Sequence, residues 1–588
     1  MIVPMKKATI LIENKDAEAT VHYLRTLGVL HIEHQNLPES RDISALQEKA
    51  ALLNSSFDVL NQAMMLEKNL QQQKKINGDW MAVANHIIDL GKRQEELESS
   101  SRNITGQINE WERWGDVDLN QIQHLIQYGI YLKLYQVPVK EIRSFPDDVV
   151  VKRIFTAGDV AYCVVISRRQ FECAFNEILP PKESVSLLKK RLAENNKVME
   201  MIKGEIIEFT CFYDDLSGIK KKLEKEIEFQ QVVSGMGKAG AIHYVTGYIP
   251  FDIEECLITE AKSKKWGIVI TEPSFDDNVP TLLRNPRWVS MIKPVLGLLG
   301  LTPGYRELDI SPLFLIFLSV FFGILIGDAG YGLVYILITV VLQKKMKLNT
   351  EMKPIFSLFY VLGSCAIIWG FLTGSFFGQG WLLNMGYRPL VPQLNDANFM
   401  QTLCFFLGAL HLSIAHSWRA FLKFPSLTAL ADVGYICILW TAFFLARTLI
   451  LGEPFPHWGT WLVTSGIILV ILFTNPQAHV LRGLGEGLGT IVLSFMNNIT
   501  DVISYIRLFA VGLAGLAIAE TMNTLASGFG NGGVAIVAGV VILIIGHGLN
   551  ILLGPMSVLV HGIRLNVLEF SGHANVGWSG VAFEPLKE

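Results

Sequence analysis

The sequence SYIRLFAVGLAG at positions 504–515 decides the fold of the C-terminal half. It lies inside a long apolar helical pattern, residues 487–525, and Arg507 is a permanent charge deep within that pattern. A guanidinium at membrane depth costs about 2.5–3.5 kcal/mol on insertion scales, so we expect a functional reason for it. A second arginine, Arg564, lies in the next and last apolar stretch, LVHGIRLNVLEF at 559–570. These two arginines are the main indication of function.

Each arginine ends a polar stripe on an otherwise apolar helix, because residues three or four positions apart share one helix face. Successive spans run in opposite directions, so the two stripes approach the arginines from opposite sides of the membrane. This arrangement predicts two offset half-paths for an ion, although each stripe alone is equally well explained as a hydrogen-bonding face between helices. The stripe before Arg507 consists of Ser494, Asn497, Asp501 and Ser504, and the stripe before Arg564 consists of His547, Asn550, Gly554, Ser557 and His561.

The composition divides the chain into two parts. Half of its 588 residues are hydrophobic and the mean hydropathy is +0.35, which indicates membrane spans. Residues 1–305 are mixed and charge-rich and are expected to be cytoplasmic. Residues 306–588 are dominated by apolar runs and are expected to form a transmembrane domain with a cytoplasmic C-terminal tail. The net charge of −4 does not indicate nucleic-acid binding, and the seven scattered cysteines and the absence of a P-loop motif predict no metal, no cofactor and no ATP site on this chain.

The C-terminal half contains eight candidate spans of about 20 apolar residues. They lie at about 306–327, 328–346, 355–378, 397–418, 427–449, 458–475, 487–525 and 534–569. Basic residues follow the second, fourth and sixth spans, whereas the alternate loops are poor in them. The positive-inside rule therefore predicts a multi-pass inner-membrane protein with both termini in the cytoplasm. The basic residues are Lys344, Lys345, Lys347, Lys353, Arg419, Lys423 and Arg482.

Three polar residues in these spans are interpreted as structural. Asp328 lies in GDAGYG at 327–332, where a satisfied turn is favoured over an ion ligand. His411 and His416 lie on the fourth span, and histidines in such places are more often structural contacts than ligands.

The N-terminal half predicts an α+β fold of two α/β lobes joined by a long antiparallel coiled-coil hairpin. Alternating strand patterns mark the lobes, and helices are expected at about 44–114 and 183–230. The second helix has a heptad seam, in which apolar residues are spaced by four and three positions. The seam consists of Leu188, Leu192, Asn195, Met199, Ile202, Ile206, Phe209, Tyr213 and Leu216.

Motifs along the whole chain resemble subunit a, called subunit I in bacteria, of the V/A-type rotary ATPases. They are MIVPMKKATILIE at the start, VTGYIP at 245–250, YRELDISP at 305–312, GDAGYG at 327–332, SYIRLFAVGLAG at 504–515, HGIRL at 561–565 and FEPL at 583–586. By this resemblance Arg507 and Arg564 match the paired essential arginines of the family, and His561 matches a polar position one turn before the second. Better-known members carry an acid several turns before each arginine, whereas here Asp501 is the only acid in its stripe. Glu520 and Glu569 lie beyond the arginines, and Glu520 is included among the candidate ion-path residues.

The resemblance implies an ion-translocating stator subunit that works as part of a synthase or a pump. Its implied partners are a proteolipid c-type ring, peripheral stalk subunits, the central stalk subunit of the rotor, the other subunits of the ATPase and membrane lipid. Two alternatives from other classes are a self-contained secondary ion transporter and a membrane-anchored coiled-coil scaffold. The identity of the ion, H⁺ or Na⁺, stays open because the binding carboxylate would lie on another chain.

Overall fold

The computed structural model describes all residues except 34, 37, 39, 67–72, 117–118, 147, 171–174, 180–182, 347–351, 380–385, 387, 475–492, 529–532 and 588. By their internal contacts the residues form two compact units. The first consists of Met1–Leu11, Gly28–Glu33 and Thr246–Leu586, and the second of Ile12–Leu27, His34–Val245 and Lys587–Glu588. The predicted boundary between residues 305 and 306 was drawn from composition, whereas these two units are defined by internal contacts. The predicted boundary therefore stays a prediction. Lys347, Arg482 and the start of the seventh predicted span lie outside the described residues.

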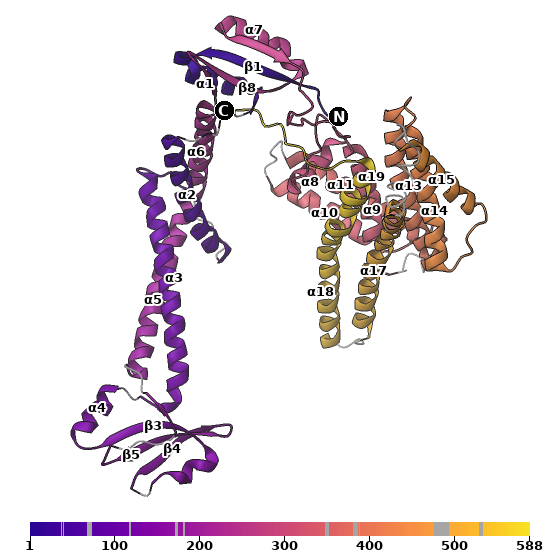
Figure 1. The fold of residues 1–588 in the computed structure, drawn as a ribbon. Coiled ribbons are helices and arrows are strands. Elements are labelled where there is room, and N and C mark those ends of the chain that lie inside the picture. Colours follow the sequence, from indigo (N-terminus) through magenta and orange to yellow (C-terminus); the bar gives the residue numbers. More distant parts are fainter. Residues whose placement is uncertain are drawn as a thin grey trace. The chain divides into compact units, whose positions relative to one another are not determined.

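The second unit is built on long helices that pack along their lengths. Figure 1 shows α3 and α5 side by side, and Ile87 near the start of α3 shares a buried cluster with Ile202 near the end of α5. Ile108 near the end of α3 packs with Leu188 at the start of α5, so the two helices are antiparallel. The helices are α1 (Ala17–Leu27), α2 (Arg41–Leu66), α3 (Trp80–Trp111), α4 (Leu119–Gln127), α5 (Val185–Phe209) and α6 (Tyr213–Ser234).

The helix expected at 183–230 is interrupted. A short 3-10 turn, Thr210–Phe212, separates α5 from α6, and the Thr210 hydroxyl donates to the carbonyl of Ile207 at 2.6 Å. Such a side-chain bond competes with the helical ladder. On the seam, Leu188 and Ile202 are buried, whereas Asn195 lies at the exposed edge with its amide 3.4 Å from Ser100 Oγ. Supercoiling of the pair stays a prediction.

A four-stranded antiparallel sheet lies at one end of α3 and α5 (Figure 1). Strand β5 pairs along its full length with β3, from Tyr131↔Ser167 to Pro138↔Val160, so its alternate side chains share one face. Buried Tyr135 and Val137 pack with Val165 on that face. The strands are β4 (Val150–Ala157), β5 (Val160–Ser167), β3 (Tyr131–Pro138) and β6 (Asn176–Ile178), in this order.

The other sheet has the order β2-β8-β1-β9, with β7 added beside β8. Its strands are β1 (Met5–Glu13), β2 (His31–Glu33), β7 (Gly237–Ala239), β8 (Ile242–Pro250) and β9 (Gly267–Thr271), and helix α7 (Glu254–Lys264) precedes β9. The C-terminal segment of the first unit returns to this sheet: Thr281 N donates to Val581 O at 2.7 Å, and Leu586 N donates to Leu30 O at 3.1 Å. The amino group of Met1 pairs with Asp309 at 2.6 Å, just before the first apolar helix.

The rest of the first unit is helical. Five of its helices, within the described residues, are long and apolar enough to cross a membrane: Lys353–Thr373, Ala397–Lys423, Ala429–Leu451, Leu493–Ser527 and Gly533–Ala574. Ser311–Ile326 and Gly459–Phe473 are shorter apolar helices. The chain is thus a membrane protein, and the full number of eight spans stays a prediction. The elements are α8 (Lys293–Leu298), α9 (Ser311–Ile326), α10 (Ala329–Lys345), α11 (Lys353–Thr373), α13 (Ala397–Lys423), α14 (Ala429–Leu451), α15 (Gly459–Phe473), α17 (Ile506–Ser527), α18 (Gly533–Ser557) and α19 (Ser571–Ala574).

Asp328 is a structural turn residue, as the sequence indicated. Its side chain is buried and caps α10 by accepting from the backbone of Gly330 at 2.7 Å and Tyr331 at 3.2 Å. It also accepts from Ser375 Oγ at 2.7 Å and from the backbone of Phe377 and Gly378 at 2.8 Å each. One carboxylate therefore joins the α9–α10 turn to the segment after α11.

Candidate functional site

The helix that carries Arg507 is anchored by Tyr505. The long helical segment Leu493–Ser527 is interrupted at Tyr505, which is completely buried, with its hydroxyl 2.9 Å from His411 Nδ1 on α13. Gly408 of α13 permits this approach, because a Cβ there would lie 2.7 Å from the Tyr505 ring. Two residues on, Arg507 Nη1 is buried and has no hydrogen-bond partner in the described part of the chain. An unpaired buried guanidinium atom is costly, so a partner outside this chain is expected.

Arg564 lies between two π-helical segments, Val558–Gly562 and Leu565–Phe570, which follow α18. The irregular stretch comes shortly after Pro555, which has no backbone N–H to give to the carbonyl of Ile551. The hydroxyl of Tyr335 donates to that carbonyl instead, at 3.0 Å. Gly554 gives Tyr335 this access, since a Cβ would lie 2.6 Å from its hydroxyl. Wide π turns are frequent at functional sites, where they redirect side chains.

The two arginine charges converge on Glu569. Arg564 Nε lies 3.6 Å from Glu569 Oε1; the Arg564 side chain is 52% exposed and that of Glu569 only 5%. The charge of Arg507 also acts on Glu569, and both arginines act on His561. Glu569 Oε2 is buried and unpaired among the described residues, like Arg507 Nη1. The site thus combines the half-buried Arg507 and the half-exposed Arg564 with a buried carboxylate.

A chain of directly hydrogen-bonded ionisable side chains leads away from this site. His573 Nε2 lies 3.1 Å from Asp501 Oδ2, and His573 Nδ1 lies 2.9 Å from His416 Nε2. His416 Nδ1 lies 3.0 Å from Asp432 Oδ1. Lys423 Nζ contacts Asp432 Oδ2 at 2.6 Å. We call Asp432, His416, His573 and Asp501 the histidine chain.

Of the predicted stripe before Arg507, only Asp501 makes a polar contact with another helix that the structure records. Ser504 donates to the carbonyl of Thr500 within its own helix, at 2.8 Å. Asn497 is exposed and Ser494 is half-buried. Their place on the path stays a prediction.

The stripe before Arg564 divides into two parts. His547 lies 2.8 Å from the Tyr331 hydroxyl and 3.1 Å from Asn523 Oδ1, and Asn550 donates to the carbonyl of Gly515 at 2.7 Å. These hydrogen bonds join neighbouring helices. They match the alternative interpretation of the stripe, in which it is a hydrogen-bonding face between helices. Ser557 and His561 are half-buried and lie closer to the arginines along the chain.

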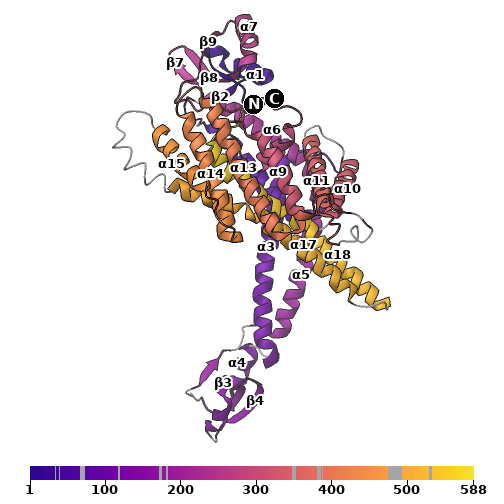
Figure 2. The same cartoon turned by 90° about the vertical axis from the view of Figure 1, so that its right-hand side faces the viewer.

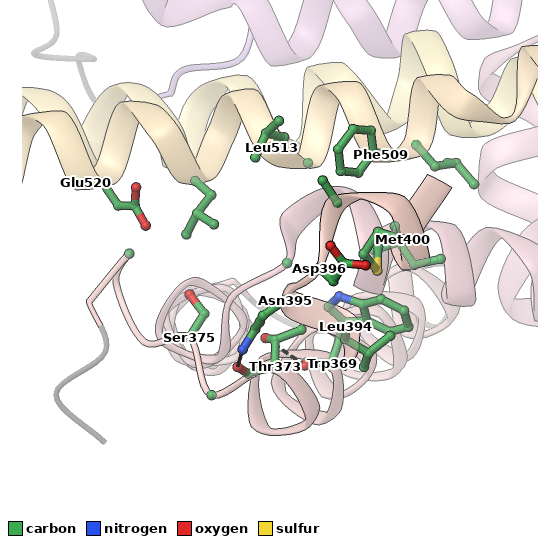
Figure 3. A pocket seen from close by; sticks show the side chains of 18 of the residues that line it. Trp369, Thr373, Ser375, Leu394, Asn395, Asp396, Met400, Phe509, Leu513 and Glu520 are labelled. Atoms are coloured by element: carbon green, nitrogen blue, oxygen red, sulfur yellow. Dashed lines mark hydrogen bonds between the residues drawn. The ribbon is translucent and has the colours of Figure 1, made fainter. Parts of the chain in front are cut away.

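A pocket of about 340 Å³ runs beside α17 (Figure 3). One wall is the α17 face from Phe509, two residues after Arg507, to Glu520. The opposite wall includes Asn395 and Asp396 before α13, and Figure 3 shows the carboxylates of Glu520 and Asp396 facing the space between these segments. The predicted residue Glu520 therefore lines a cavity that reaches the neighbourhood of Arg507.

The structure brings together Arg507, Arg564, His561 and Asp501 and separates them from His547 and Asn550. Glu569 lies outside the path predicted from the sequence, and His416 was predicted to be structural. His573 and Asp432 were not among the predicted site residues. Glu569 follows Arg564 by five residues, a spacing that faces the arginine only in a π turn. Within the described residues, no group of three or more His, Cys, Asp or Glu side chains could hold a metal ion.

The apolar helices and the α/β lobes define a membrane protein with a large part outside the membrane and with ionisable side chains buried among its helices. No protein-family model matches the chain. It is 29% identical to V-type ATP synthase subunit I of Borreliella burgdorferi, over 100% of both chains. It is also 29% identical to V-type ATP synthase subunit I 1 of Treponema pallidum, again over 100% of both. The chain is thus similar along its full length to V-type ATP synthase subunit I proteins, which confirms the resemblance inferred from its motifs.

A more distant relative is A-type ATP synthase subunit I of Methanocaldococcus jannaschii, 25% identical over 69% of this chain and 64% of the relative. Among solved structures, the crystal structure of the cytoplasmic N-terminal domain of subunit I, homolog of subunit a, of V-ATPase covers 45% of this chain and 100% of that domain. Its identity is 15% and its TM-score 0.25, values too low to carry an argument.

Proposed function

We propose that this chain is the ion-translocating stator subunit of a V/A-type rotary ATPase, working as synthase or pump. The observation that carries the proposal is the arginine pair on the last two membrane segments. Arg507 has a buried, unpaired guanidinium nitrogen, and Arg564 is half exposed. A carboxylate on another chain, carried past them by a proteolipid c-type ring, is the partner that such a pair favours.

The chemistry follows from the charges. A cation beside a carboxylate favours its ionised form, so a protonated or cation-loaded ring carboxylate releases its ion near the arginines. Arginine suits this role because it does not give up its own proton. The fixed positive charges also repel a cation that would pass directly from one side to the other.

Two routes to the arginines start from opposite ends of the spans. The polar stripe before Arg507 and the histidine chain lie towards the end with the basic loops, the cytoplasmic end by the positive-inside rule. The pocket beside Glu520, together with Ser557 and His561, supplies the route from the other side. Offset routes force the ion to travel with the ring between them, and this couples transport to rotation.

An apolar face near Arg564 suits a ring of helices. Figures 1 and 2 show α17 and α18 side by side, and many apolar side chains of α18 are exposed. In the full complex we expect eight spans and an α3–α5 coiled-coil arm that holds peripheral stalk subunits near the central stalk. The exposed residues on α18 include Val537, Val541, Ile544, Ile545, Leu552 and Met556.

Purification of the complex through a tag on this chain tests the proposal. A stator should co-purify with a proteolipid ring and with ATP-hydrolysing subunits, and the preparation should drive ion transport with ATP in vesicles. A chain that purifies without a ring, or that moves ions without ATPase subunits, would instead be a scaffold or a secondary transporter.

A further inference from the structure

We infer that the histidine chain conducts protons between the cytoplasmic end of the membrane part and the arginine site, and that the transported ion is therefore H⁺. The inference rests on the proposed function and adds to it the identity of the ion and a specific route. It is carried by the direct contacts among four buried or part-buried side chains from α13, α14, α19 and the helix before α17.

The contacts leave no room for a metal cation. The three links of the chain measure 3.0, 2.9 and 3.1 Å between donor and acceptor atoms. An ion placed between two such atoms would require them about 4–5 Å apart, because cation–oxygen distances are roughly 2.0–2.6 Å. The cavity next to the chain, lined by Ala415, Phe570 and Ala574, has a volume of about 10 Å³. That is at the lower limit for a single water, so a hydrated cation does not fit.

The hydrogen-bond partners of each side chain determine which atoms of the histidine chain carry protons. Lys423 and Arg419 both contact Asp432, at 2.6 and 3.5 Å, and stabilise it as a carboxylate, which accepts hydrogen bonds in the state before proton transfer. His416 must therefore donate through Nδ1 and, when neutral, accept through Nε2. His573 then donates through Nδ1 and accepts through Nε2 from a protonated Asp501.

One concerted shift moves a proton's charge along the whole chain. The Asp501 proton passes to His573 Nε2, the His573 Nδ1 proton passes to His416 Nε2, and the His416 Nδ1 proton passes to Asp432. Asp501 becomes a carboxylate and Asp432 becomes neutral, while both imidazoles stay neutral, so atoms and charge balance. The Asp432 proton then leaves to water at the Lys423 end, and rotation of both imidazole rings returns their tautomers to the starting state. The same steps in reverse order move a proton inward.

The surroundings of the chain suit both ends of this path. At the outer end Lys423 is 36% exposed and gives access to water. His416 is stacked on Tyr435, and Arg419 Nη1 donates to the backbone carbonyl of His573 at 2.9 Å, so both histidines are positioned by neighbouring side chains. At the inner end Asp501 lies on the same helical segment as Arg507, Leu493–Ser527.

The test compares variants of the assembled complex in vesicles, with ATP-driven acidification and ATP hydrolysis measured with and without added Na⁺. His573→Gln keeps a polar side chain but cannot relay a proton, and acidification should fall about 100-fold. His573→Ala should recover with added imidazole but not with pyrazole, which has the same shape and is a much weaker base. This comparison uses one preparation, so assembly is constant. His457→Gln, at an exposed histidine just before α15, is the control for loss of an imidazole outside the chain.

The outcomes separate the inference from the proposed function. Acidification that is independent of Na⁺, abolished in His573→Gln and restored by imidazole alone supports the relay. Normal acidification by both His573→Gln and His416→Gln would overturn the relay and leave the stator function standing. Transport of Na⁺ by the wild-type complex would overturn it equally. A wild-type complex without a ring or transport would overturn both.

Discussion

At the scale of single residues, the two arginines that look alike in the sequence have different surroundings. Arg507 is half-buried with an unpaired nitrogen, whereas Arg564 is more exposed and lies 3.6 Å from Glu569. Because Arg564 already has a carboxylate partner on its own chain, we expect Arg507 to contribute more than Arg564 to an interaction with a carboxylate on another chain.

We predict that Arg507→Ala assembles but loses ATP-driven ion transport, because nothing then favours release of the ion from the passing carboxylate. Arg507→Lys should not restore it fully, since an ammonium is a hydrated point charge without the planar fork. ATP-driven transport in vesicles, scaled to the amount of assembled complex, measures the effect. Arg388→Ala, which removes an exposed loop arginine, is the control and should transport normally. Wild-type transport by the Arg507→Ala variant would contradict the proposal.

At the scale of elements, the helices that carry Arg507 and Arg564 are irregular near these two residues. The break at Tyr505 and the π turns around Arg564 place the charges, and the Asp328 cap holds the α9–α10 turn beside α11. These features depend on side chains that come from other parts of the chain.

Asp328→Ala should destabilise the membrane part by at least about 3 kcal/mol, because several buried backbone N–H groups lose their acceptor. Five hydrogen bonds to the carboxylate disappear together. Thermal unfolding of the purified protein in detergent measures the change. Asp396→Ala removes an exposed cap of α13 and should cost only about 1 kcal/mol. Equal effects of the two substitutions would contradict a special role of Asp328.

Ile202→Pro should break α5, at a cost of about 3 kcal/mol or more for a proline inside a helix. We expect ATP hydrolysis to become uncoupled from ion transport while the membrane part still inserts. Ile202→Leu is the control, because it keeps an apolar side chain at this buried position without the backbone effect. If the proline variant keeps hydrolysis and transport coupled, the arm is not a stator element.

At the scale of the whole molecule, orientation in the membrane decides which route opens to which side. Both chain ends of the first unit hydrogen-bond to residues outside the apolar helices, Met1 to Asn285 and Leu586 to Leu30, and we therefore expect them on one side of the membrane. The basic loops predict that this side is the cytoplasm.

Single cysteines introduced into a chain without its seven native cysteines test this orientation. Cysteine in place of the exposed Asn497 should react with a membrane-impermeant thiol reagent from the cytoplasmic side. Cysteine in place of Glu520, in the pocket, should react from the outside. A cysteine at buried Ile499 should react from neither side, because a desolvated thiol stays protonated. Labelling of both positions from one side would rule out offset routes.

The sequence by itself determined the membrane character, the paired arginines and the family resemblance. Each of these depends on local properties: hydropathy over about 20 residues, a charge inside an apolar run, and short motifs. The sequence also favoured a structural turn at Asp328, because an aspartate at a glycine-rich break is a local turn signal. Its role as the cap of α10 came from the structure.

Only the tertiary structure decided what surrounds the arginines. Glu569 faces Arg564 because π turns change the spacing of side chains, and no residue pattern in the sequence announces them. His573 and His416 are 157 positions apart and meet only when α19 packs against α13. His547 and Asn550 fit the predicted stripe but hydrogen-bond to neighbouring helices, because helix periodicity gives the face of a residue and not what lies opposite that face.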